Sequence, residues 1–349
     1  ANIKVFSLND ADPGLANHQT GAKIRLKEGQ EEPVSQPVRP TNPKMRLHIG
    51  KAIEAMLKNK IIESSNSPWG ANVLLVPKKT PGEYRMVCDL RALNAKTVAM
   101  SYPLPRISDV LSSLSGKSVF SVMDATQGFY QIPMAHEDRE KTAFTCEMGC
   151  FHYLKMPMGL KNSGPIFQQF MDKALGKLKW NCAIVYVDDQ LVYSNSIEEH
   201  FEHLGKVFEA LIENGIHLRA KKTFLFRSSI NFLGHVISER GIAPDADKIK
   251  SILNMNPQTK KSVHSWVGMA GYYRRHIKDF STHVRPLQDI INGKVKIDKE
   301  GLNDKQKRAV EFIKKCLTTK PILAHPDFER PFTLHTDASI QGLGAVLSQ

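Results

Sequence analysis

Two adjacent aspartates, Asp188 and Asp189, stand between two apolar segments and are the residues best suited to chemistry. Residues 183–187 and 191–193 are rich in apolar and β-branched side chains, so they predict the arms of a hairpin with acids at its bend. A third acid, Asp124, ends the apolar segment 119–123, which predicts another strand. Carboxylates that lie together repel one another, and removal from water penalises their charged forms. A divalent cation offsets both penalties, and Mg²⁺ prefers carboxylate oxygens.

Such an acidic cluster supports phosphoryl transfer. Two Mg²⁺ ions about 3.5–4 Å apart can stabilise both the attacking and the leaving oxygen. For the pair Asp188 and Asp189 alone, a solvated turn is the alternative, because Asp is common in turns. Asp124 and a group of cations elsewhere in the chain favour the metal site.

Those cations lie on a second predicted hairpin. Apolar residues predict strands over 73–76 and 84–88, and Thr80-Pro81-Gly82 between them suits a type II turn. Lys78 follows one strand and Arg85 lies on the other. The Arg fork fits phosphate oxygens and Lys supplies a point charge, so the pair could grip a polyphosphate. A solvated hairpin arm is the simpler interpretation of Lys78 by itself.

The elements that position these residues predict a mixed α+β domain. Apolar residues at helical spacing predict a helix over 43–60, another after Ser163, and a third after a capping box of Ser196 and Glu199. Strands and helices then alternate through the middle of the chain, as in α+β folds. Residues 1–43 lack a sustained apolar period and predict an extended lead-in.

One more predicted hairpin raises the question of zinc. Residues 142–146 and 150–154 form its arms, and Cys146, Cys150 and His152 lie on or beside them. Structural zinc takes four ligands, and no fourth ligand stands near these three in the sequence. Packed thiols are therefore the preferred interpretation.

Composition points to a polyanionic partner. The 349 residues suffice for about two domains, and 48 Lys and Arg against 35 Asp and Glu give a net charge of +13. Between Lys248 and Lys278 there are seven basic residues and no acid, and helical patterns over 246–254, 260–275 and 283–292 predict a basic helical module. No apolar run reaches the ~18 residues of a membrane span. The 5 Cys form no CxxC pair, which favours a reducing compartment.

The segment Tyr186-Val187-Asp188-Asp189 resembles the Tyr-x-Asp-Asp box of reverse transcriptases. Further blocks occur in the family's order, and they lie at 67–69, 85–94, 102–107, 131–133, 138–144, 232–235 and 270–275. Together they resemble the polymerase of gypsy-type LTR retrotransposons, relatives of retroviral polymerases, over roughly residues 40–349. Because so many blocks agree in order, the resemblance is far more specific than the four-residue box.

The resemblance implies a right-hand polymerase with fingers, palm and helical thumb, followed by a connector and the start of an RNase H-like domain. Its expected boundaries are a lead-in at 1–43, mainly fingers at 44–118, palm at 119–240 with an inserted fingers segment at about 131–162, thumb at 241–292, connector at 293–332 and incomplete RNase H-like domain at 333–349.

The resemblance also implies roles for particular residues. Asp124, Asp188 and Asp189 would be catalytic and hold two Mg²⁺ ions, with Mn²⁺ as a substitute. Lys78 and Arg85 would bind the triphosphate of a dNTP. Phe129, five residues after Asp124, would lie under the sugar and exclude a 2′-OH; taken without the family, a core aromatic is the preferred interpretation. Gly159 would contribute its backbone beside the nucleotide.

Primer and template contacts follow from the same comparison. Leu233, Gly234 and His235 match the region that presses the primer end toward the metals, although a buried strand with a Gly bend fits them equally. The basic segment 248–278 matches the thumb, whose phosphate contacts predict salt-dependent binding without sequence preference. The cations expected there are Lys260, Lys261, Arg274 and Arg275. A solvated basic face is the alternative.

The end of the sequence, from Leu334 onward, resembles the opening strands of the family's RNase H domain, with Asp337 as its first metal-binding acid. The other acids of that site are not present, so no RNA cleavage is expected. Motifs of the aspartic protease and the integrase are also absent from the sequence, which resembles an internal part of a Pol polyprotein.

The expected activity is RNA- and DNA-templated DNA synthesis, in which a primer 3′-OH attacks the α-phosphate of a dNTP in line. Its partners would be an RNA template, a DNA primer/template duplex and dNTPs, with a homodimer or a longer Pol product as a further possibility and no membrane. The family implies a cytoplasmic location within virus-like particles. Two alternatives stay open, a catalytically silent nucleic-acid-binding subunit and an RNA-dependent RNA polymerase, although Phe129 argues against the latter.

Overall fold

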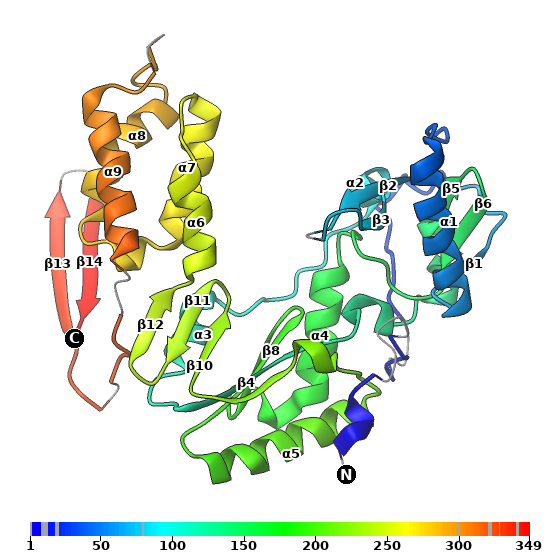
Figure 1. Ribbon diagram of the computed structural model, residues 1–349, viewed down its shortest axis with the longest axis horizontal. Helices are drawn as coiled ribbons and strands as arrows, with labels where there is room; N and C mark the ends of the chain where they lie inside the picture. The colour runs from blue at the N-terminus through cyan, green and yellow to red at the C-terminus, as the bar shows by residue number, and fades with distance from the viewer. Residues whose placement is uncertain are drawn as a thin grey trace. The chain divides into compact units, whose positions relative to one another are not determined.

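The computed structural model describes residues 2–7, 13–17, 21–78, 80–298, 301–319, 323–327, 329–339 and 342–349 (Figure 1). The chain divides into two compact units. The first unit comprises Ala1–Pro105 and Ser121–Phe226, and the second comprises Arg106–Phe120 and Arg227–Gln349.

A five-stranded sheet of the first unit carries the predicted cationic hairpin. Its strand order is β1 (Ile62–Ser64), β6 (Gly149–Tyr153), β5 (Phe144–Cys146), β2 (Ala71–Pro77) and β3 (Tyr84–Cys88). Helix α1 (Pro43–Lys58) contacts β1 and β3, and Asn42 caps its first turn by accepting from the Met45 amide. Short helices α2 (Arg91–Lys96) and α3 (Ile107–Ser112) follow β3 in the chain and precede β5 and β6.

The β2–β3 turn forms as its sequence predicts. The Glu83 amide donates to the Thr80 carbonyl at 3.2 Å, which closes a four-residue turn with Pro81 and Gly82 at its centre. Gly82 has a φ of +80°, the conformation that a type II turn requires at its third position. The register pairs Val76 with Arg85, so Arg85 lies close to the turn.

A four-stranded sheet carries the predicted acidic residues. Its order is β7 (Ala183–Tyr186), β8 (Asp189–Ser194), β4 (Val119–Asp124) and β9 (Phe224–Arg227). Helix α4 (Ser163–Leu175) packs against β7, and α5 (Ile197–Glu213) packs against β8. The interior is apolar: Phe120, Phe167, Met171, Val192 and Leu211 are all at most 1% exposed. Each such side chain contributes roughly 1.5–3 kcal/mol on burial, which fixes the strands that end in acids.

The cap of α5 differs in one detail from the predicted box. Ser196 Oγ accepts from the Glu199 amide at 3.2 Å, as expected. The Glu199 carboxylate, however, accepts from the Asn195 amide at 2.7 Å rather than from the Ser196 amide. The helix ends at Glu213 with Asn214 as its C-cap, and Gly215 takes a φ of +66°, which is typical of the residue that follows a helix end.

The described residues of the N-terminal lead-in include a 3₁₀ turn, Asn2–Val5, and they contribute to the core of the first unit. Phe6 forms an isolated bridge with Leu218, and Ala22 forms another with Met134. Val5 is fully buried, and Ile24 is 5% exposed. The sparse apolar residues of this segment therefore fill gaps left by regular elements.

The second unit contains a three-stranded antiparallel sheet and a group of helices. The strands are β10 (Ser229–Phe232), β11 (His235–Ser238) and β12 (Gly241–Pro244). The helices are α6 (Ala246–Asn254), α7 (Lys260–Tyr272), α8 (Phe280–Ile291) and α9 (Asp304–Thr318). Trp266, Leu287 and Ile313 lie at the centre of their common core and are fully buried. Strands β13 (Thr333–Ser339) and β14 (Gly342–Ser348) form a separate antiparallel pair.

Helix α9 lies within the predicted connector, 293–332, where no helix was assigned from the sequence. Its buried residues Ala309, Val310, Ile313 and Leu317 have helical spacing, and Asn303 and Gln306 form a reciprocal capping box at its start. Helix α7 is also three residues shorter than predicted, because Arg274–His276 form a 3₁₀ turn.

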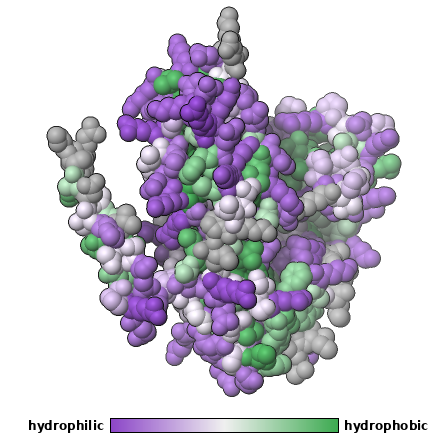
Figure 2. Space-filling model, turned by 60° about the vertical axis from the view of Figure 1, so that its left-hand side comes forward, coloured by the Kyte–Doolittle hydropathy of each residue, from purple (hydrophilic) through white to green (hydrophobic). Residues whose placement is uncertain are grey.

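The surface in Figure 2 is mostly hydrophilic, with apolar side chains interspersed among polar ones. Among the described residues, every helix is too short or too polar to cross a membrane.

Candidate active site

The acidic pair lies at a tight hairpin turn. Tyr186 of β7 pairs with Asp189 of β8, so Val187 and Asp188 form a two-residue loop. Val187 has a φ of +53°. Two-residue hairpin loops favour positive φ at their first position because its twist matches that of the strands. A β-branched residue adopts this conformation only at a cost of roughly 1–2 kcal/mol, so the surrounding structure must hold the turn in place.

The carboxyl group of Asp188 is partly buried and lies near two other acids. Its Oδ1 atom is buried and has no hydrogen-bond partner among the described residues. Burial, followed by the charges of Asp124 and Asp189, raises the pKa of Asp188 to about 6, and Lys222 acts in the opposite direction. The three acids predicted from the sequence therefore lie close enough to influence the central one electrostatically.

Asp124 is neutralised from within the chain. It ends β4, and its Oδ2 atom accepts a short hydrogen bond from the ammonium of Lys222. The Arg219 amide donates a hydrogen bond to the Asp124 carbonyl at 2.9 Å. The next three residues, Ala220–Lys222, form a 3₁₀ turn that ends at Lys222. Nothing in the local sequence pattern around Lys222 shows that its side chain reaches Asp124.

These residues fit a divalent cation. As their side chains stand, no set of three His, Cys, Asp or Glu within the described ranges converges to hold a metal. Even so, Asp188 presents a buried carboxylate oxygen without a partner, and the Lys222 ammonium already supplies one positive charge to the cluster. Carboxylate oxygens are the ligands that Mg²⁺ prefers. A bound cation would relieve the same repulsion that raises the pKa of Asp188.

The predicted triphosphate-binding cations are exposed on the β2–β3 hairpin. The Lys78 ammonium pairs with Glu83 Oε2 at 3.0 Å, across the turn. Because both side chains are about half exposed, this ion pair contributes little to stability. Arg85 projects from β3 and is exposed. Lys79, the other basic residue of this arm, lies outside the described residues.

Phe129 and Gly159 are positioned by ordinary packing and backbone contacts. Phe129 belongs to the 3₁₀ turn Gly128–Gln131, and its ring packs edge-on against Phe167 with centroids 5.6 Å apart. Gly159 has a φ of +94°, and its carbonyl accepts from the Asn94 amide side chain at 2.8 Å. A Cβ added at Gly159 would meet nothing within 4 Å, so its backbone angle rather than crowding requires glycine.

In the second unit, tyrosines hold the turn that was predicted to contact the primer. Leu233 and Gly234 join β10 to β11 with φ values of +46° and +71°. The hydroxyl of Tyr272 donates to the Leu233 carbonyl at 2.7 Å, and that of Tyr273 donates to the Gly234 carbonyl at 2.9 Å. His235 is only 4% exposed, and burial lowers its pKa. We therefore assign His235 a role in supporting this turn, while contact with the primer stays a prediction.

The predicted thumb cations are exposed at both ends of α7. Lys260 and Lys261 open the helix, and Arg274 and Arg275 follow its last turn. Cations at a helix N-terminus oppose the helix dipole and cost stability. Contact of Lys260 and Lys261 with nucleic-acid phosphates stays a prediction.

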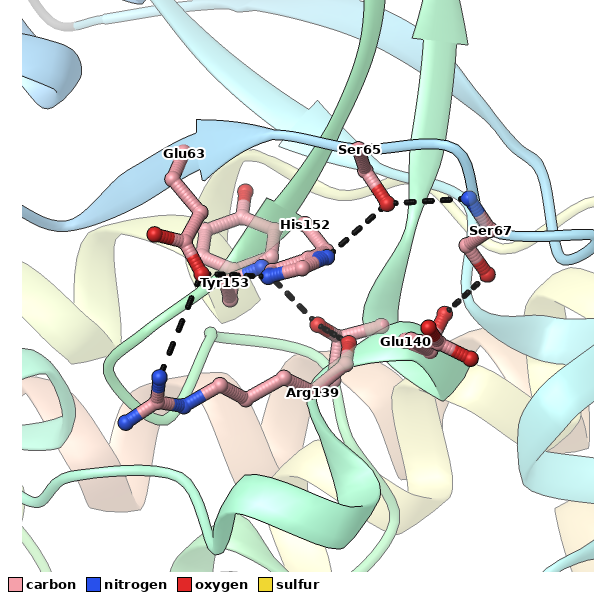
Figure 3. Close-up of polar contacts among 8 residues, drawn as sticks. Glu63, Ser65, Ser67, Arg139, Glu140, His152 and Tyr153 are labelled. Atoms are coloured by element: carbon pink, nitrogen blue, oxygen red, sulfur yellow. Dashed lines mark hydrogen bonds and ion pairs between the residues drawn. The ribbon is translucent and has the colours of Figure 1, made fainter.

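The candidate zinc ligands are engaged by neighbouring side chains. Figure 3 shows the His152 ring between Glu63 and Ser65, each 2.8 Å from one ring nitrogen. Arg139 lies 3.9 Å from the same Glu63 oxygen. Burial raises the pKa of both Cys146 and Cys150, which disfavours their thiolate forms. These contacts favour the packed-thiol interpretation.

Asp337, the predicted RNase H acid, lies in β13 opposite Gly344 of β14. The middle pair of this hairpin is Thr336 with Ala345, and Asp337 belongs to the next pair along β13.

Comparisons with known proteins agree with this architecture. Residues 76–237 match the family described as reverse transcriptase (RNA-dependent DNA polymerase), and residues 302–349 match an RNase H-like domain found in reverse transcriptase. The chain is 35% identical to the retrovirus-related Pol polyprotein from transposon gypsy of Drosophila melanogaster, over 99% of this chain and 35% of that protein. It is 36% identical to the corresponding polyprotein from transposon 297, over 87% of this chain and 29% of the relative. The chain thus spans about a third of the length of these relatives.

Solved structures with the same fold extend the comparison. A foamy viral protease-reverse transcriptase in complex with double-stranded DNA has a TM-score of 0.85 and 26% identity, over 96% of this chain and 58% of that one. The same kind of protein in complex with an RNA/DNA hybrid has a TM-score of 0.80 and 25% identity, over 96% of this chain and 45% of that one. The predicted α+β, right-hand polymerase fold is therefore confirmed. The chain belongs to the reverse transcriptase family, among the Pol polyproteins of gypsy-type LTR retrotransposons.

Proposed function

We propose that this chain is an RNA- and DNA-templated DNA polymerase that extends a primer with dNTPs. The observation that carries the proposal is the acidic turn, where Asp188 has a buried, unpartnered oxygen close to Asp124 and Asp189. Reverse transcriptases generally use divalent metal ions. In this chain Asp124, Asp188 and Asp189 would hold two Mg²⁺, with Mn²⁺ as a substitute. When bound, these ions supply charge neutralisation for the attacking and leaving oxygens of phosphoryl transfer.

The chain's own residues position the nucleotide. Lys78 and Arg85 would bind the triphosphate, which requires Lys78 to exchange its weak pair with Glu83 for phosphate oxygens. Phe129, held on edge by Phe167, would present its ring to the sugar and leave no room for a 2′-OH. The Gly159 backbone, fixed by Asn94, would lie beside the nucleotide.

The second unit supplies groups for the nucleic acid. Leu233 and Gly234 would contact the primer strand, with His235 supporting them, and Lys260, Lys261, Arg274 and Arg275 would contact phosphates. Two related foamy viral proteins were solved with double-stranded DNA and with an RNA/DNA hybrid, and the +13 charge of this chain suits the same kind of partner. Binding should therefore weaken steeply with salt and show no sequence preference.

Three finer points belong to the same proposal. The active enzyme would be a homodimer or a longer Pol product, and it would be located in cytoplasmic virus-like particles. The expected domain boundaries, from the lead-in at 1–43 to the RNase H-like segment at 333–349, are proposed with it. Residues 302–349 match the RNase H-like model, with Asp337 as the one predicted metal-binding acid, so RNA cleavage is not proposed.

Primer extension tests the proposal. A labelled DNA primer on an RNA template, with Mg²⁺ and either dNTPs or rNTPs, should be extended by dNTPs alone. Asp188→Asn and Asp189→Asn should abolish extension while template–primer affinity stays within about twofold. Tight binding without extension by the unaltered chain would support the structural-subunit alternative, and extension by rNTPs would support the RNA polymerase alternative.

A further inference from the structure

A buried glutamine on α4 contacts the backbone of β7 and of the first residue of the acidic turn. Gln168 is 0% exposed, although glutamine is mostly found at protein surfaces. Its side-chain oxygen accepts from the Val187 amide at 2.8 Å, and its side-chain nitrogen donates to the Val185 carbonyl at 3.0 Å. One amide group therefore holds β7 and the strained first residue of the turn together.

The orientation of this amide is fixed by Asp172, one helical turn further along α4. Gln168 Nε2 donates to Asp172 Oδ1 at 2.9 Å. Asp172 Oδ2 in turn accepts from the Tyr102 hydroxyl at 2.7 Å and from the Lys179 ammonium at 2.6 Å. A flipped Gln168 would turn its nitrogen toward the Val187 N–H and its oxygen toward a carboxylate and a carbonyl. Both arrangements are repulsive, so the amide has one stable orientation.

The energetics explain why the turn needs this support. Val187 adopts a φ of +53° at a cost of roughly 1–2 kcal/mol. The turn also contains Asp188, whose buried oxygen finds no partner among the described residues. Both features favour a different conformation of the loop. The hydrogen bond from the Val187 amide to Gln168 opposes that change at the residue directly before Asp188.

We propose that Gln168 is a positioning residue for the polymerase reaction, and that Asp172 acts through it. Gln168 touches neither substrate nor metal in this account; it fixes the backbone from which Asp188 and Asp189 project. The inference rests on the proposed function, since the reaction being positioned is the one assigned above. Removal of the amide should move the carboxylates without removing them, and a displacement of about 1 Å near the reacting atoms can cost about 10²-fold in rate.

The test compares Gln168→Leu, which keeps the apolar bulk and loses all three hydrogen bonds, with Gln169→Leu at the neighbouring, half-buried position of the same helix. Single-turnover extension should show a fall of about 10²-fold in the maximal rate for Gln168→Leu, with dNTP affinity and template–primer affinity within about threefold of the unaltered chain. Gln169→Leu should stay within about threefold in all three quantities. A structural defect alone would lower the active fraction and the melting temperature instead of the rate per active site.

A second variant tests the link through Asp172. Asp172→Asn should give a smaller loss, and the double variant Gln168→Leu/Asp172→Asn should be no slower than Gln168→Leu alone, because residues that act through one contact are not additive. If the unaltered chain extends primers and Gln168→Leu keeps its maximal rate, the positioning role is wrong while the proposed function stands. If the unaltered chain does not extend primers, the proposed function itself fails.

Discussion

Gly234→Ala should weaken the β10–β11 turn through two separable effects. The first is the backbone conformation, because an alanine at a φ of +71° costs roughly 1 kcal/mol. The second is contact, because an added Cβ would lie 3.3 Å from the Tyr273 hydroxyl. That hydroxyl cannot retreat freely, since it donates to the Gly234 carbonyl at 2.9 Å. Disturbing this bond adds about 1 kcal/mol, for a total of about 2 kcal/mol.

Gly293→Ala is the matched control, because it introduces an alanine at a similar positive φ without bringing the added Cβ close to a tyrosine hydroxyl. Gly293 has a φ of +75°, and its added Cβ would approach only the flexible end of Lys260, at 3.7 Å. Hydrogen exchange measured by mass spectrometry should be faster in Gly234→Ala than in the unaltered chain for peptides that cover residues 229–244. We expect its opening free energy to fall by about 2 kcal/mol, which is on the order of 30-fold in exchange. Peptides around Gly293 in the control should change by about fivefold.

Tyr273→Phe then shows whether the contact is responsible. Combined with Gly234→Ala, it should cost less than the sum of the two single changes by about 0.5 kcal/mol or more. Primer extension should fall in Gly234→Ala and stay unchanged in Gly293→Ala. Equal local costs for Gly234→Ala and Gly293→Ala, or strict additivity with Tyr273→Phe, would refute the argument that the tyrosine hydroxyls hold this turn.

Three further perturbations follow from the structure. Phe129→Ala should raise the use of rNTPs relative to dNTPs by about tenfold or more, measured by single-nucleotide incorporation, and unchanged sugar discrimination would contradict the role of the ring. Burial lowers the pKa of His200 to about 4, with His203 and Glu199 as its charged neighbours. The His200 imidazole binds a proton more tightly in the unfolded chain than in the folded chain. The free energy of unfolding, measured with urea, should therefore be highest above pH 6.5 and fall by up to about 3 kcal/mol as the pH approaches 4. The same pH dependence in a His200→Asn chain would show that His200 is not its cause. Lys222→Met should tighten Mn²⁺ binding severalfold in electron paramagnetic resonance titrations, because it removes an ammonium that pairs with Asp124. Weaker or equal binding would show that Lys222 does not compete with a metal.

Much of the fold is predictable because its signals are local. The β2–β3 hairpin follows from two short apolar segments and from the requirement for glycine at one turn position, and Gly82 has a φ of +80°, as a type II turn requires. Helix α1 starts at Pro43 behind the cap Asn42, as the sequence indicates. The acids stand at the bend because the apolar arms on either side must pair with each other. In these cases a short window of sequence contains the whole physical cause.

Other features depend on partners that are distant in the sequence. Asp124 and Lys222 are 98 residues apart, and no local pattern reveals that they pair. Gln168 stands among apolar residues of α4, and only the folded chain shows that it bonds to Val187. The burial of His235 likewise follows from the rings of Tyr272 and Tyr273, 5.4 and 5.5 Å from its own. The three acidic residues could be predicted from residue type, whereas their partners Lys222 and Gln168 could not.

Helix α9 is a different case, since its signal is present in the sequence. Ala309, Ile313 and Leu317 recur every fourth residue, and Asn303 caps the start. The many charged residues between them mask the apolar stripe, because charge is typical of both connectors and exposed helix faces. Residues 304–318 form a helix because their apolar side chains are buried against the other helices of the second unit.

The most direct test of the central claim is extension of a DNA primer on an RNA template by this chain with Mg²⁺ and dNTPs, compared with Asp189→Asn. The account predicts extension by the unaltered chain and none by the variant, with equal affinity of both for the template–primer duplex. Extension that survives in Asp189→Asn would contradict it, because the acidic turn would then not be where the reaction occurs.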